Sequence, residues 1–103
     1  MSYKEFKLKN KNIIGIVEEI IEVEQMTFKN RTQDKAHQRY FLMNYLRENT
    51  TLSLTSIGNM FDRNHATIMN CLRRHNDYTE YKDKNYSKNV ASIKEYLEQV
   101  LVS

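Results

Sequence analysis

The sequence predicts an all-α fold, a single five-helix domain that contains a helix-turn-helix. The first observation is that the 103 residues include two Gly and no Pro, whereas strand-rich domains usually need these residues for their tight turns. The second is that apolar residues recur at intervals of three and four, as on one face of a helix. The third is the composition, 40% apolar and 28% charged, which suits one compact domain and leaves no apolar run of membrane-spanning length.

The first two helices follow from apolar periodicity. Residues 1–11 are Lys-rich and weakly patterned, and we predict a flexible basic N-terminal arm there, followed by the domain over 12–103. A helix begins at about Asn12, with isoleucines and Val17 on one face and glutamates on the other. Residues 34–49 predict the second helix, which has a broad apolar stripe.

A short helix, a tight turn and a second helix are predicted next. Ser53 has the side chain of an N-cap. The helix that follows contains Gly58, for which we expect a packing reason, because a missing side chain allows a neighbouring helix to come close. Residues 62–64 form the turn, and Asn64 caps a helix over 65–76.

The remainder of the chain predicts a polar connection and a final helix. Residues 77–85 form the connection, and the last helix covers about 87–102. Its stripe from Val90 to Leu101 is interpreted as core, with a dimer seam as the alternative.

Positive charge is concentrated in the middle of the chain. The net charge is +3, but residues 31–75 hold all six Arg and one Lys against three acidic residues, a net charge of +4. The planar guanidinium makes bidentate hydrogen bonds to phosphate and guanine. This segregation indicates a polyanion-binding surface, and a solvated face with a chance excess of Arg is the alternative.

The sequence offers no group for catalysis. Cys71 is the single cysteine, so no internal disulfide can form, and we interpret it as a small buried residue. The three His have no ligand spacing, and no carboxylate pair or Gly-rich phosphate loop is present. We therefore expect no enzyme, no cofactor and no metal.

The plan over residues 53–74 is that of a helix-turn-helix, in which the first turn of the second helix enters the major groove. This first turn begins with Arg63, Asn64, His65, Ala66 and Thr67. Asn pairs with adenine, Arg pairs with guanine, and the Ala and Thr methyl groups contact a thymine methyl group. Arg63 has an alternative role, a hydrogen bond back to the turn.

These residues also carry a family resemblance. The segments Tyr45-Leu46-Arg47-Glu48-Asn49-Thr50, Ser53-Leu54-Thr55-Ser56-Ile57-Gly58-Asn59-Met60-Phe61 and Arg63-Asn64-His65-Ala66-Thr67-Ile68 resemble the signature of the C-terminal DNA-binding domain (domain IV) of the bacterial replication initiator DnaA. The resemblance covers roughly residues 12–102. It implies a fold of the TrpR and DnaA domain IV type.

The resemblance implies roles for two upstream residues. Arg31 lies where the family has an arginine that enters the minor groove, and Arg39 lies where it has a basic residue that contacts the DNA backbone and groove.

Several positions depart from the family pattern. Asn64 replaces an aspartate that takes part in base recognition, and Ala66 replaces a hydroxyl residue. Thr55 replaces a common proline, and Asp62 stands where glycine is usual in a turn that is one residue shorter. The usual DnaA box is therefore not the expected target. The family's ATPase loop, Gly-x-x-x-x-Gly-Lys, is also missing.

The sequence predicts a stand-alone, sequence-specific binder of double-stranded DNA that acts in replication initiation control or transcription regulation. We expect a cytoplasmic monomer of bacterial or phage origin that binds no nucleotide. The alternative is a protein-interaction module that kept the fold, such as an antagonist of the host replication initiator. The predicted DNA-binding residues are Arg31, Arg39, Ser53, Arg63, Asn64, His65, Ala66, Thr67, Arg73 and Arg74.

Overall fold

Five helices make up the structure. The computed structural model describes residues 3–24, 26 and 32–101, with side chains for 13–24, 26 and 32–100. The helices are α1 (Tyr3–Val23), α2 (Gln33–Asn49), α3 (Leu54–Phe61), α4 (His65–Glu80) and α5 (Lys84–Leu101), and the described residues contain no strand. The prediction of an all-α, five-helix fold is confirmed.

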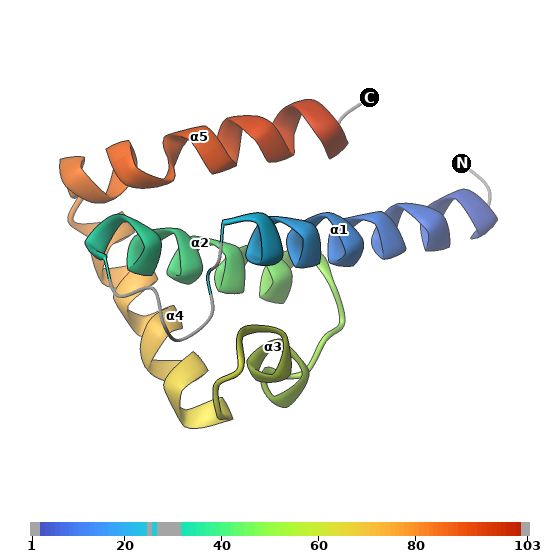
Figure 1. Cartoon of the computed structure of the whole chain (residues 1–103), viewed down its shortest axis with the longest axis horizontal. Helices are drawn as coiled ribbons and strands as arrows, with labels where there is room; N and C mark the ends of the chain where they lie inside the picture. The colour runs from blue at the N-terminus through green and yellow to red at the C-terminus, as the bar shows by residue number, and fades with distance from the viewer. Residues whose placement is uncertain (1–2, 25, 27–31, 102–103) are drawn as a thin grey trace.

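Helix α2 lies at the centre of the molecule and packs against each of the other four helices (Figure 1). Helices α2 and α5 run in the same direction (Figure 1), and Gln38 near the start of α2 donates through Nε2 to the carbonyl of Asn89 near the start of α5, at 3.0 Å. Helix α4 leads from the start of α5 down to α3, so its N-terminal end lies at the edge of the molecule, beside α3 (Figure 1).

The core is formed by the apolar faces of all five helices. Burial of each large aliphatic or aromatic side chain contributes about 1.5–3 kcal/mol, which makes these residues the main stabilising element. On α5, Val90, Ile93 and Leu97 are buried, which confirms the interpretation of that part of the stripe as core, whereas Val100 is exposed. The largest fully buried side chains are Val17, Met26, Leu42, Met43, Leu46, Ile57, Phe61, Ile68 and Leu97.

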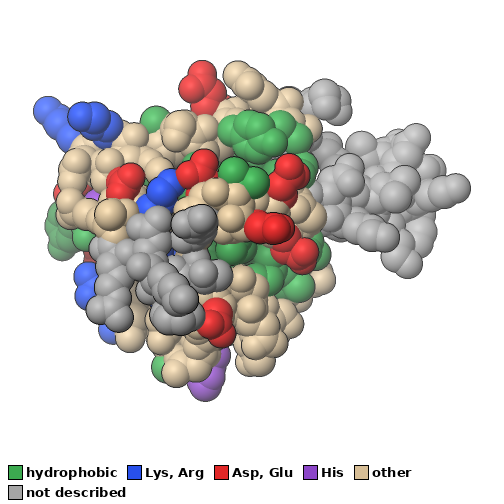
Figure 2. All heavy atoms as spheres, in the orientation of Figure 1, with side chains coloured by type: hydrophobic (Ala, Val, Ile, Leu, Met, Phe, Trp, Pro, Cys, Tyr) green, Lys and Arg blue, Asp and Glu red, His purple; other side chains and the backbone are tan. Residues whose placement is uncertain are grey.

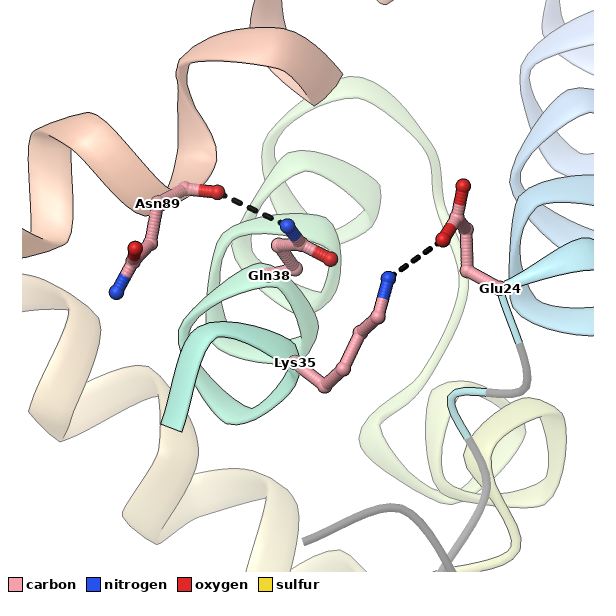
Figure 3. A network of polar contacts seen from close by, with 4 residues as sticks. All are labelled: Glu24, Lys35, Gln38 and Asn89. Carbon is pink, nitrogen blue, oxygen red and sulfur yellow. Dashed lines mark hydrogen bonds and ion pairs between the residues drawn. The ribbon is translucent and has the colours of Figure 1, made fainter. Parts of the chain in front are cut away.

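Polar contacts tie the first helix and the last helix to α2. Lys35 Nζ forms an ion pair with Glu24 Oε2 at 2.5 Å just beyond the end of α1. Figure 3 shows the Lys35–Glu24 ion pair and the Gln38–Asn89 hydrogen bond on opposite sides of α2. A pair of this kind at the surface contributes at most about 1 kcal/mol, so it orients α1 more than it stabilises the fold.

Three predicted boundaries of helices are wrong: the start of α1, the end of α4 and the start of α5, which is Lys84 rather than about residue 87. Helix α1 begins at Tyr3 rather than at Asn12, because the intervening residues are mostly Lys, Glu and Leu, which are good helix formers, with no Gly or Pro among them. The division into an arm (1–11) and a domain (12–103) stays a prediction. None of the helices in the described part of the chain is long and apolar enough to cross a membrane.

Helix α4 also continues to Glu80, four residues past its predicted end, so Tyr78 is helical rather than part of a connection. Tyr78 stacks on Tyr86 with ring centroids 4.9 Å apart, and this packing favours the helix despite the polar sequence around it. The connection is short because Lys82 adopts a left-handed φ of 53° and Asp83 caps α5, accepting from the backbone N–H of Tyr86 at 2.8 Å.

Candidate nucleic-acid interface

The turn between α3 and α4 is fixed by backbone geometry. Asp62 takes the left-handed conformation (φ 58°, ψ 48°) directly after α3. Its N–H donates to the carbonyl of Asn59 at 3.4 Å, and the N–H of Arg63 donates to the carbonyl of Gly58 at 2.8 Å. These two bonds form a Schellman motif, which satisfies carbonyls at the end of α3 and reverses the chain within three residues.

Gly58 is required because the turn folds back onto α3. A Cβ atom at this position would lie 2.4 Å from the carbonyl oxygen of Arg63 and 3.5 Å from Cγ1 of Ile68. The sequence correctly predicted a packing reason for this glycine. It expected a neighbouring helix as the cause, whereas the nearest atom belongs to the turn itself.

Both predicted N-caps are present. Ser53 Oγ accepts from the N–H of Ser56 at 3.1 Å and donates to Ser56 Oγ at 3.0 Å. Asn64 Oδ1 accepts from the N–H of Thr67 at 2.9 Å, which starts α4. The cap uses the oxygen of the Asn64 side chain, so its exposed amide nitrogen is available to a ligand.

One face of α4 is exposed along its first nine residues. His65, Ala66 and Arg73 lie on this face, while Ile68, Cys71 and Leu72 are buried against the core. Met69 and Asn70 are exposed as well, and sequence reasoning did not select them. Their spacing could have identified them from the sequence, because Met69 lies one helical turn after His65 and Asn70 lies one turn after Ala66.

Three arginines from different elements, Arg39 on α2, Arg63 in the turn and Arg74 on α4, place positive charge around the same buried residue, Cys71. Burial and then the charge of Arg63 lower the pKa of Arg39. The charges of Arg39, Arg63 and Arg74 all act on the thiol of Cys71. Like charges gathered at a half-exposed surface repel one another, and a bound phosphate relieves this repulsion.

The arginine side chain of the turn also has a structural contact. Arg63 Nη1 donates to the carbonyl of Asp62 at 3.1 Å, as the alternative role predicted from the sequence requires. This bond ties the guanidinium group of Arg63 to the turn.

The remaining predicted residues lie in different settings. Ser53 is exposed at the far end of α3, Thr67 is half-buried and uses its backbone N–H in the cap, and Arg73 and Arg74 are exposed on α4. Arg31 lies outside the described residues. Figure 2 shows visible Lys and Arg side chains only in the left half of that view, while acidic and apolar side chains dominate the right half.

Other reactive groups in the described chain are held in structural roles. Burial raises the pKa of the Cys71 thiol, which stays protonated and is a poor nucleophile at neutral pH. No three His, Cys, Asp or Glu side chains converge as metal ligands within the part that the structure describes.

A comparison with protein families adds to this geometry. The model of a family described as "Bacterial dnaA protein helix-turn-helix" matches residues 10–74. The match ends inside α4, so the C-terminal half of α4 and the whole of α5 lie beyond it. Neither a curated protein nor a solved structure matches the chain.

Proposed function

The chain belongs to the bacterial DnaA helix-turn-helix family, which makes it a DNA-binding domain, and we propose that it recognises one short double-stranded sequence through the start of α4. In this proposal the first turn of α4 lies in the major groove, and Arg31 enters the adjacent minor groove. The chain acts in the control of replication initiation or in transcription regulation, and this role involves no ATPase.

The observation that carries the proposal is the exposed face of α4 beside the three arginines. A helix N-terminus favours a nearby phosphate through its free N–H groups and its dipole. His65, Ala66, Met69 and Asn70 give this face polar and methyl groups of the size that reads base edges in the major groove.

The residues divide into those that read bases and those that hold phosphate. Asn64 and His65 are proposed to contact bases, and Ala66 contacts a thymine methyl group. Arg39 and Arg74 hold the DNA backbone, which supplies affinity without sequence preference. Ser53, Thr67 and Arg73 complete the contact surface at its margins.

Selection from a random pool of duplexes tests the proposal directly. We expect one enriched motif, bound with a log–log salt slope of roughly −4.5 if about five phosphates are neutralised. Arg39→Ala weakens binding to all sequences alike, whereas His65→Ala relaxes preference at one base pair. A pool that returns no enriched motif contradicts the proposal.

The protein-interaction alternative is supported by the altered residues Asn64 and Ala66, which change the recognition surface. Under this alternative the chain binds the host initiator rather than DNA. A mobility shift with nonspecific duplex at low salt separates the two, because only a DNA-binding chain retards the duplex.

A further inference from the structure

A groove of about 790 Å³ lies between α2, the C-terminal half of α4 and α5. Its lining includes Phe41 and Tyr45 of α2, His75 and Tyr78 of α4, and Tyr86 and Val90 of α5. None of the described candidate DNA-binding residues lines it. Two of its three walls lie wholly or partly beyond the family match, so the groove belongs to the part of the chain that the family does not explain.

The aromatic lining of the groove is held rigid by its own contacts. The Tyr78 and Tyr86 rings stack with centroids 4.9 Å apart, and those of Phe41 and Tyr45 stack at 6.3 Å. Tyr86 and His75 share a hydrogen bond of 2.6 Å between Oη and Nδ1. Tyr86 is buried, whereas Phe41, Tyr45 and Tyr78 are half-buried and present part of their rings to the groove. Rigid aromatic rings of this kind are typical of the energetic centres of protein interfaces, because they bury much area with little loss of entropy.

The charges around the groove indicate what kind of partner it accepts. Glu48, Glu95 and Glu98 line it, against two lysines, Lys82 and Lys94. Burial and then the charge of Glu98 raise the pKa of Tyr45, so this carboxylate lies near the aromatic wall. Carboxylates at this position repel a nucleic acid and attract a cationic side chain.

The length of the walls fits a helix. The lining residues of α2 cover 41–48 and those of α5 cover 86–98, which at 1.5 Å per residue corresponds to roughly 10 Å and 18 Å, or about two to three helical turns. A helix that lies along such a groove anchors itself through apolar side chains at i, i+3 or i+4, and i+7.

We propose that this groove binds an amphipathic helix of a partner protein, which places bulky apolar side chains on the aromatic lining and a Lys or Arg beside Glu48 and Glu98. The partner binds while α4 is on DNA, because the two surfaces share no described residue. The chain thereby tethers a second protein to its DNA site.

The probe is a phage-displayed library of 16-residue helical peptides, selected against the full chain. We expect enriched peptides with apolar residues one turn apart and a basic residue at one end. Glu98→Lys, which is exposed and lies outside the core, weakens their binding by roughly tenfold, because attraction becomes repulsion. The matched control is Glu18→Lys, an exposed glutamate on α1 that does not line the groove.

Three outcomes overturn the proposal. They are a selection without enrichment, enriched peptides that bind Glu98→Lys as well as the parent chain, and sedimentation showing that a second copy of the chain fills the groove. Duplex binding is measured in parallel for every variant. If Glu98→Lys loses peptide binding and keeps DNA binding, the groove acts independently of the proposed DNA surface, and each can fail without the other.

Discussion

Asn64→Asp changes the atom that this position offers to DNA while it preserves the helix cap. In the parent chain Oδ1 accepts from the N–H of Thr67 at 2.9 Å, which leaves the amide nitrogen as a donor. This donor suits a base acceptor, such as guanine O6 or thymine O4. The carboxylate of the variant uses one oxygen in the same cap and presents the other as an acceptor, which suits cytosine N4 or adenine N6.

The two effects differ in size. A bidentate base contact discriminates by about 1–3 kcal/mol, so a single hydrogen bond whose sense is reversed changes preference by roughly 1–2 kcal/mol, or about 5- to 30-fold at one base pair. Asn and Asp are equivalent as N-caps, and a carboxylate at the start of a helix adds about 0.3–1 kcal/mol. The variant is therefore at least as stable as the parent chain.

Selection from a random duplex pool, carried out for both proteins, measures the preference at each base pair. We expect one position to change from an acceptor base to a donor base, with the rest of the motif retained. Asn64→Ala is the control for the cap, because it loses about 1 kcal/mol of stability as well as the contact. Identical motifs from Asn64→Asp and the parent chain would refute the assignment of Asn64 to a base.

Gly58→Ala places a Cβ 2.4 Å from the carbonyl oxygen of Arg63, so we expect a net loss of about 1–2 kcal/mol in chemical denaturation, even though Ala is the better helix former. Asp62, at φ 58°, is better replaced by Gly than by Ala, and the Gly variant should be about 1 kcal/mol more stable than the Ala variant. Burial lowers the pKa of His37 and of His75 from 6.5, only partly offset by nearby acidic residues. The unfolded chain therefore binds more protons below about pH 6.5, and the free energy of unfolding falls as pH drops from 7.5 to 5.5.

For each of these predictions, one experimental result would contradict it. If Gly58→Ala had the same urea midpoint as the parent chain, the turn would accommodate the added Cβ without loss of stability, which contradicts the first prediction. Equal stabilities of the Gly and Ala variants at Asp62 would remove the argument from left-handed geometry. A pH-independent midpoint would contradict the buried, neutral state of His37, whose Nδ1 accepts from Asn89 Nδ2 at 3.0 Å.

The sequence predicted those features whose signal is local. The caps at Ser53 and Asn64 were recognisable from a short polar side chain before an apolar repeat. The family resemblance and the family match agree on the helix-turn-helix, and the glycine of α3 was identified as special before its contact was known. Each of these features is determined by a few residues that are close in sequence.

The features that it missed depend on contacts distant in sequence. Tyr78 was assigned to the connection (77–85), and Tyr86 was placed just before the last helix (about 87–102). The stacking of these two rings on each other and their packing on His37 extend both helices instead. The convergence of Arg39 with Arg63 was also beyond sequence reasoning, because it requires α2 to lie beside the turn. The number of charged residues predicted that the DNA-facing surface would be positively charged, but it did not predict where on the fold this charge would lie.

The residues that position α4 differ from the residues that α4 exposes to solvent. Its angle to α3 is held by Gly58, by the left-handed Asp62 and by the backbone bonds of the turn, none of which uses a side chain on the exposed face of α4. The exposed residues His65, Ala66, Met69 and Asn70 contribute little to the core, and their replacement costs little stability. A chain built in this way can change the sequence that it reads at small cost to its fold. Asn64 is the position where the two roles meet, because its side-chain oxygen caps the helix and its amide nitrogen is left for the proposed contact with DNA.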